Sequence, residues 1–161
     1  MIRIIPTTVF AVFLAALTAC SSTSITPTLS PQATAPTPPP PVAQVDIASL
    51  PGNYGLASYH REQDLDRTIK QAKIACRNPY KIDPGSNGGV VMHAPGQSGP
   101  AEFFLKKDDS GQSYLGPKGP AGGPNDQRVV SYQDRTLVAQ WTSGRLRSVY
   151  GTMVYVPCAQ T

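Results

Sequence analysis

Apolar positions recur with helical spacing in one segment of the chain. Small or apolar side chains stand four, three and four residues apart at Leu65, Ile69, Ala72 and Cys76. This spacing places them on one face of a helix. Acidic residues crowd the start of the segment and basic residues its end, which suits the helix dipole, and Asn78-Pro79 then ends the pattern. The sequence therefore predicts an α-helix over about residues 61–75.

The rest of the C-terminal part alternates short apolar runs with turn residues about every ten positions. The runs that predict strands are Tyr54–Tyr59, Tyr80–Ile82, Gly89–Ala94, Ala101–Lys106, Gln112–Leu115, Arg128–Gln133, Thr136–Trp141 and Arg145–Val156. Such spacing is typical of antiparallel barrels and sandwiches. We expect a mainly β fold, a small antiparallel barrel or sandwich of about seven or eight strands, with one α-helix near residues 61–75.

The first twenty residues follow a different pattern. Arg3 gives a short positive start, Thr7–Leu17 is apolar, and Leu17-Thr18-Ala19-Cys20 leads into a run of Ser and Thr. These features resemble the signal peptide and lipobox of bacterial lipoproteins. In that family the signal is cleaved before the cysteine, whose thiol carries diacylglycerol and whose new amine is usually acylated. The resemblance implies a lipoprotein signal peptide over residues 1–19 and lipidation of Cys20.

The same resemblance implies a location. Two or three acyl chains on one residue hold a protein firmly at a bilayer, whereas a single chain does so only marginally. Ser21 follows the cysteine, and in enteric lipoproteins Asp at that position favours retention in the inner membrane. We therefore expect a protein lipid-anchored to a bacterial membrane, the outer membrane facing the periplasm. An ordinary secretory signal cleaved near Ala19, or an uncleaved anchor, are the alternatives.

A proline-rich segment separates this region from the β-rich part. Seven of the 17 prolines lie between Ser21 and Asp46, among Ser, Thr and Ala, with no charged residue before Asp46. Such a composition buries too little apolar surface to fold, so residues 20–46 are expected to be the lipidated Cys and a disordered tether. At 3.1 Å per residue in polyproline II, the tether reaches at most about 80 Å. A proline-rich ligand motif is the alternative interpretation. The globular domain is expected over residues 47–161.

Composition narrows the classes of function. The chain has 161 residues, 14 Lys+Arg against 10 Asp+Glu, and a net charge of +4. This low and mixed charge lacks the dense basic stripe of nucleic-acid-binding proteins, so no nucleic-acid partner is expected. The cysteines point to an oxidising compartment. With Cys20 taken by lipid, Cys76 and Cys158 remain, and in an exported protein they predict one disulfide.

Candidate catalytic and metal-binding residues are few. His60 and His93 are the two histidines, and no G-x-S-x-G nucleophile motif occurs. On a helix only His60 and Asp64 would converge, and two ligands rarely make a tight metal site. We therefore expect no catalytic residues, no metal, no cofactor and no enzymatic activity.

Two regions are candidate binding surfaces. Four arginines near the C-terminal hairpin, opposed in sequence only by Asp134, could form a patch for an anionic ligand or glycolipid: Arg128, Arg135, Arg145 and Arg147. A dispersed solvated face is the alternative. The Gly- and Pro-rich segment Gly116–Pro124 is expected to be a mobile loop, and loops of this kind often carry binding.

The start of the first predicted strand carries a further resemblance. Gly52-Asn53-Tyr54, followed by a short meander with late basic residues, resembles the G-x-W start of small lipocalin-like barrels and also small periplasmic inhibitors of metalloproteases. We expect a non-enzymatic envelope lipoprotein whose disulfide-clamped β domain binds an envelope component or a protein partner. The resemblance implies two alternatives, a carrier of a small apolar ligand and an inhibitor of an exported protease.

Overall fold

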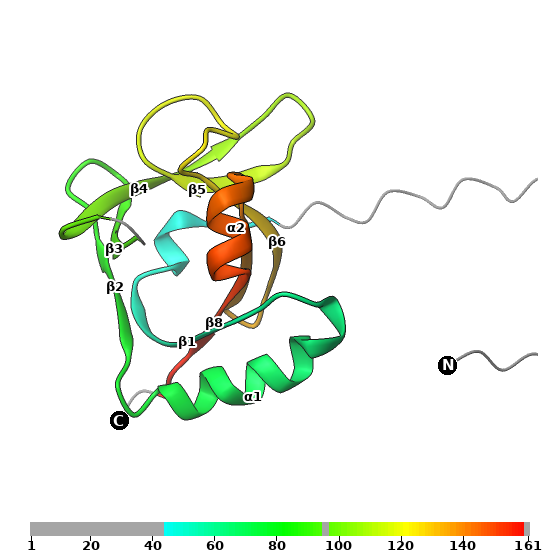
Figure 1. The fold of residues 1–161 in the computed structure, drawn as a ribbon. Coiled ribbons are helices and arrows are strands. Elements are labelled where there is room, and N and C mark those ends of the chain that lie inside the picture. The colour runs from blue at the N-terminus through cyan, green and yellow to red at the C-terminus, as the bar shows by residue number, and fades with distance from the viewer. Residues whose placement is uncertain (1–43, 95–96, 160–161) are drawn as a thin grey trace, which may run out of the picture. The chain divides into compact units, whose positions relative to one another are not determined.

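Eight antiparallel strands close into a barrel in the computed structural model, which describes residues 44–94 and 97–159 (Figure 1). The strands are β1 (Gly52–Tyr59), β2 (Tyr80–Pro84), β3 (Val90–His93), β4 (Pro100–Lys107), β5 (Ser113–Gly116), β6 (Gln127–Gln133), β7 (Thr136–Trp141) and β8 (Thr152–Pro157). Each strand pairs with its neighbour in sequence, and β8 closes the barrel on β1 from Tyr54↔Pro157 to Tyr59↔Thr152. The predicted β fold is confirmed, and the structure decides for a barrel.

Four helical segments accompany the strands of the described region. They are η1 (Ile47–Ser49), η2 (Glu62–Asp64), α1 (Leu65–Ala75) and α2 (Gly144–Tyr150). The helix predicted over residues 61–75 is confirmed as η2 followed by α1. The signal peptide, Cys20 and nearly all of the tether predicted from the sequence lie outside the described residues.

Helix α1 lies outside the barrel and packs against β1 and β8 (Figure 1). Thr68 and Ala72 are its buried positions, and Ala72 lies with Leu65 and Ile69 in a small apolar cluster. The other members of this cluster come from the strands, and they are Tyr59, Val138, Val154, Val156 and the partly buried Ala57. The predicted apolar face of the helix is thus the face that contacts the barrel.

Close approach of α1 to β1 depends on Gly55. A Cβ at this position would lie 1.7 Å from the carbonyl oxygen of Ala72, which is backbone and cannot rotate away. We expect Gly55→Ala to lower the free energy of unfolding by about 2–3 kcal/mol, because α1 must shift from the sheet. Gly144→Ala is the control, since a Cβ there meets nothing within 4 Å. Urea unfolding measures the stability of both variants. Equal free energies of unfolding for Gly55→Ala and Gly144→Ala would refute this packing.

The second half of the chain departs from the prediction at one place. The strand predicted over Arg145–Val156 is wrong in its first half, where α2 forms instead. Ser143 caps this helix, its hydroxyl oxygen accepting a hydrogen bond from the Leu146 amide at 3.4 Å. Leu146 and Tyr150 are four residues apart and pack against the same core. A spacing of four places two side chains on one face of a helix and also on one face of a strand, so the sequence pattern did not distinguish the two. Gly151, with φ 66°, ends the helix before β8, and the one predicted α-helix becomes two.

Candidate binding surfaces

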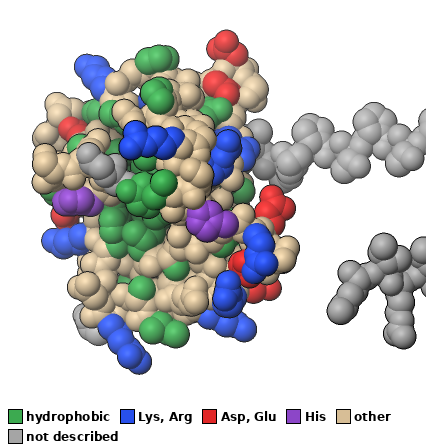
Figure 2. Space-filling model, viewed as in Figure 1, with side chains coloured by type: hydrophobic (Ala, Val, Ile, Leu, Met, Phe, Trp, Pro, Cys, Tyr) green, Lys and Arg blue, Asp and Glu red, His purple; other side chains and the backbone are tan. Residues whose placement is uncertain are grey.

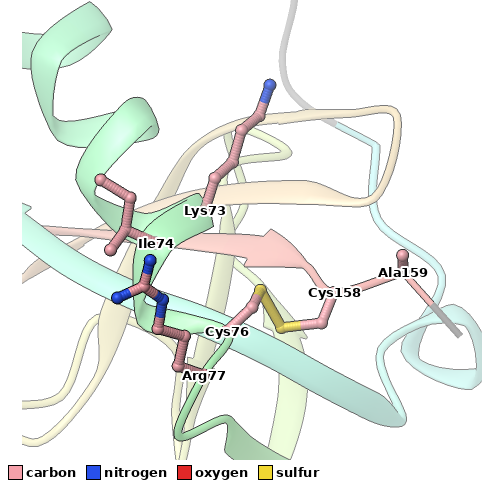
Figure 3. A pocket seen from close by; sticks show the side chains of 6 residues that line it. All are labelled: Lys73, Ile74, Cys76, Arg77, Cys158 and Ala159. Atoms are coloured by element: carbon pink, nitrogen blue, oxygen red, sulfur yellow. A yellow bond between two sulfur atoms is a disulfide. The ribbon is translucent and has the colours of Figure 1, made fainter. Parts of the chain in front are cut away.

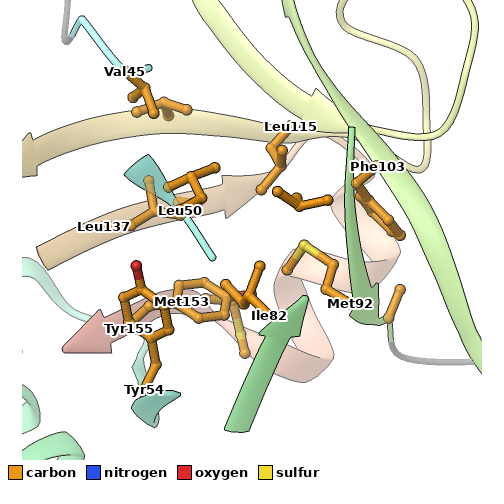
Figure 4. Packing of buried hydrophobic residues seen from close by; sticks show 14 of the residues in the cluster. Val45, Leu50, Tyr54, Ile82, Met92, Phe103, Leu115, Leu137, Met153 and Tyr155 are labelled. Carbon is orange, nitrogen blue, oxygen red and sulfur yellow. The ribbon is translucent and has the colours of Figure 1, made fainter. Parts of the chain in front are cut away.

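Large side chains fill the interior of the barrel (Figure 4). The largest side chains exposed by less than 2 % are Trp141, Tyr54, Tyr155, Phe103, Leu50, Ile82, Met92, Leu115, Leu137, Gln127, Val90 and Val129. The segment before β1 contributes Leu50 and Val45 to this core, and α2 packs Leu146 and Tyr150 against it. A carrier of a small ligand needs a cavity of about 300 Å³ or more. The side chains named here occupy the centre of the barrel, where such a cavity would lie.

Two interior tyrosine hydroxyls have local hydrogen-bond partners, whereas the buried Tyr54 hydroxyl and Trp141 indole nitrogen have none among the described residues. The Tyr155 hydroxyl donates to the Gln127 side-chain oxygen at 3.1 Å, and the Tyr80 ring meets the Tyr155 ring edge-on with centroids 5.6 Å apart. The Tyr80 hydroxyl in turn donates to the His93 carbonyl oxygen at 2.5 Å. Burial raises the pKa of Tyr80 to about 12, and it raises the pKa of Tyr155 as well. Both phenols stay protonated at neutral pH and act as structural donors.

The predicted disulfide joins the end of α1 to the end of β8. Cys76 is the C-terminal cap of α1 and Cys158 follows β8, with their Cα atoms 5.6 Å apart. The Cys158 amide also donates to the Asn53 carbonyl oxygen at 2.9 Å. The bond therefore clamps the external helix to the two strands that close the barrel.

A groove of about 480 Å³ lies beside this disulfide (Figure 3). Its lining residues are Lys73, Ile74, Cys76, Arg77, Cys158 and Ala159. The Ile74 residue is 61 % exposed, the largest exposure among the large hydrophobic residues of the described region. The Lys73 and Arg77 residues are exposed as well. The groove thus combines an apolar surface with two cations.

The structure does not bring the four candidate arginines into one site. Arg128 lies exposed in β6, where its guanidinium donates to the Gln140 side-chain oxygen at 3.2 Å. Arg135 lies in the turn at the opposite end of the β6–β7 hairpin. Arg145 and Arg147 are exposed on α2, but residues two apart on a helix point to different sides. The arrangement is dispersed over the surface.

Arg135 has a structural role at its end of the barrel. Asp134 and Arg135 have φ values of 50° and 60°, the left-handed pair that a two-residue hairpin turn requires. The Arg135 guanidinium donates to the Pro51 carbonyl oxygen at 3.0 Å and lies beside Tyr54. Burial raises the pKa of Tyr54, and the neighbouring guanidinium opposes part of this effect. Arg135 therefore ties the β6–β7 turn to the start of β1.

The Gly- and Pro-rich segment after β5 is held in place, in contrast to the expected mobile loop. The Lys106 ammonium donates to Asp126 Oδ1 at 2.6 Å and to the carbonyl oxygens of Pro117 and Pro120 at 2.9 and 3.1 Å. The second carboxylate oxygen of Asp126 accepts the Gly123 amide at 2.9 Å. Side chains of Lys106 and Asp126 are 12 % and 2 % exposed, so a nearly buried ion pair organises this loop.

Two other carboxylates hold turns. Asp108 accepts hydrogen bonds from Ser110, Gln112 and Tyr114, and these lower its pKa, the Ser110 hydroxyl most. Glu102 accepts from Asn87 and Gly89 in the β2–β3 turn, and the Asn87 side chain contributes most to lowering its pKa. Both carboxylates therefore hold their turns through fixed local hydrogen-bond partners.

Candidate chemistry on the described surface is sparse. His60 and His93 are exposed, and residues 44–94 and 97–159 contain no group of three or more His, Cys, Asp or Glu side chains placed to hold a metal ion. Over the same ranges, no helix has both the length and the apolar character needed to span a membrane. Comparison of the chain with protein-family models, curated proteins and solved structures finds no match.

The basic end of α1 is the surface that the sequence did not single out. For Lys73 and Arg77 the sequence indicates only a favourable interaction with the C-terminal end of the helix dipole. Their spacing of four, with Ile74 between them, already indicates a shared outward side once the helix is accepted. The groove beside them could not be foreseen, because it needs Cys158 and Ala159 from the far end of the chain.

Proposed function

We propose that this protein is a lipid-anchored protein of the bacterial cell envelope whose barrel acts by binding, without catalysis. The observation that carries the proposal is the pairing of Cys76 with Cys158. Disulfides persist outside the reducing cytosol. With these two cysteines bonded, Cys20 is left as the thiol that the lipobox-like segment Leu17-Thr18-Ala19-Cys20 would present for lipidation.

The filled barrel supports binding on the outside. Its interior is lined by large apolar side chains such as Trp141, Phe103 and Tyr155, which favours a protein partner or an envelope component over an enclosed small ligand. The protease-inhibitor alternative stays a prediction, and stoichiometric inhibition of an exported protease by the purified protein would support it.

Mass spectrometry of the mature protein tests the anchor. We expect the wild-type polypeptide, purified from bacterial membranes, to begin at Cys20 and to carry diacylglycerol on its thiol and an acyl chain on its amine. Cys20→Ser should remove the lipid and leave the precursor uncleaved before position 20. Ser21→Asp is the matched control, because it should keep the lipid and shift the protein toward the inner membrane. An unmodified Cys20, or a mature chain that starts elsewhere, would overturn the proposal.

A further inference from the structure

We propose that the outward side of α1 docks on the anionic lipid headgroups of the bilayer that holds the anchor. This basic face consists of Lys70, Lys73, Ile74 and Arg77. The inference rests on the proposed function, since it takes the anchored protein as its starting point. It names the surface of the barrel domain that meets the membrane.

The four residues lie along the end of α1: Lys70, Lys73 and Ile74 are in the helix, and Arg77 follows its C-terminal cap. They stand at positions i, i+3, i+4 and i+7, the spacing of neighbours on a helical surface. The opposite side, with Thr68 and Ala72, is buried against the barrel. In Figure 2, Lys and Arg side chains stand along the lower edge of the molecule, where α1 lies in Figure 1.

No ion pair of the described residues includes a cation of this face, and the nearest carboxylate along the helix is Asp66, one turn before Lys70. The ion pairs nearest in sequence join Asp64 to Arg61 and Arg67, and Asp83 to Lys81. None of these pairs includes Lys70, Lys73 or Arg77. Three exposed positive charges at the C-terminal end of α1 and just after it therefore favour an anionic partner.

The apolar part of the face indicates a lipid surface. Ile74 is 61 % exposed and lies beside the groove formed with the disulfide and Ala159 (Figure 3). A hydrophobic side chain between cations is the arrangement by which helices lie in a membrane interface, with the cations at the headgroups and the apolar group below them. An acidic protein segment would gain from the charges but would not require the exposed Ile74.

The anchor favours the bilayer over a dissolved partner. The tether expected from the sequence, at most about 80 Å long, would keep the domain close to the membrane, so that the bilayer surface is present at high effective concentration. The second exposed helix fits this role less well. On α2, Val149 is 60 % exposed, but Arg145 and Arg147 point to different sides.

Tryptophan quenching can test the contact directly. Ile74→Trp and Val149→Trp place probes at sites of 61 % and 60 % exposure, while the native Trp141 is 1 % exposed and gives a constant background. Each lipidated full-length variant would be reconstituted into vesicles with brominated acyl chains, made of phosphatidylcholine alone or with phosphatidylglycerol. We expect at least twofold stronger quenching at position 74 in the anionic vesicles, reduced by high salt, and no such difference at position 149.

Charge reversal provides the control. Adding Lys73→Glu and Arg77→Glu to Ile74→Trp should remove the preference for anionic vesicles. Equal quenching of both probes would overturn the proposal. The proposal would also be overturned if the fluorescence of the tryptophan introduced at position 74 responded to added polyglutamate and not to lipid. That result would indicate an acidic protein partner. An unlipidated Cys20 in the same sample would reject the proposed function, whereas quenching by added anionic vesicles still reports on this face alone.

Discussion

Cys76→Ser/Cys158→Ser should lower the free energy of unfolding by about 4.5 kcal/mol, one of the two largest losses that we expect in the domain. The disulfide spans 82 residues of sequence, from the end of α1 to the residue after β8. Without it, the unfolded chain regains the entropy that this long loop had lost. For a domain of this size the melting temperature should fall on the order of 15–20 °C.

Thermal unfolding with and without reductant measures this effect. The double serine variant should unfold at the same temperature in both conditions, and the reduced wild type should approach it. The variant Cys20→Ser should melt like the oxidised wild type, because its change lies outside the barrel domain. Equal melting temperatures for the double variant and the oxidised wild type would show that the bond does not clamp the fold.

Lys106→Met should cost about 3–5 kcal/mol of folding free energy, the range for a buried ion pair that loses one partner. The Asp126 side chain is 2 % exposed, so without Lys106 its charge remains buried and uncompensated. The carbonyl oxygens of Pro117 and Pro120 lose their donor at the same time. We expect the loop between β5 and β6 to loosen, with faster amide exchange at Gly123.

A double-mutant cycle separates the pair from its surroundings. Lys106→Met/Asp126→Asn should be more stable than Lys106→Met alone, because the second change removes the unpaired charge while its side-chain oxygen can still accept the Gly123 amide. Lys107→Met, at the exposed neighbouring position, should change stability by less than about 0.5 kcal/mol. If urea unfolding shows equal losses for the single and double variants, the ion pair does not organise this loop.

Local sequence signals predicted most of the secondary structure. The spacing of Leu65, Ile69 and Ala72 predicted a helix that the structure confirms. The prediction succeeded because the residues that recur at helical spacing are the ones that pack against the barrel. Turn residues between apolar runs predicted the strands for a similar reason, because Gly, Pro and Asp favour turns through their own local backbone conformation. The error at α2 arose where spacing alone is ambiguous, since Leu146 and Tyr150 fit either element.

Contacts between distant residues were beyond such signals. Nothing in the sequence near Lys106 indicates that its Nζ will lie 2.6 Å from Asp126 Oδ1. For this reason the Gly- and Pro-rich loop, whose carbonyl oxygens bind Lys106, was expected to be mobile. The arginine patch dispersed for the same reason. Arg128 and Arg135 are close in sequence, yet the hairpin of β6 and β7 places them at opposite ends.

By itself, the sequence determined the composition of the parts: an N-terminal segment with a lipobox-like end, a proline-rich segment, and a β-rich part with one pair of cysteines for a bond. These follow from residue type and short-range spacing. Only the tertiary structure decided that the strands close into a filled barrel, and that Lys73, Ile74 and Arg77 flank a groove with Cys158. The physical reason is that closure and surface shape depend on which distant side chains pack together, and one strand's pattern does not carry that information.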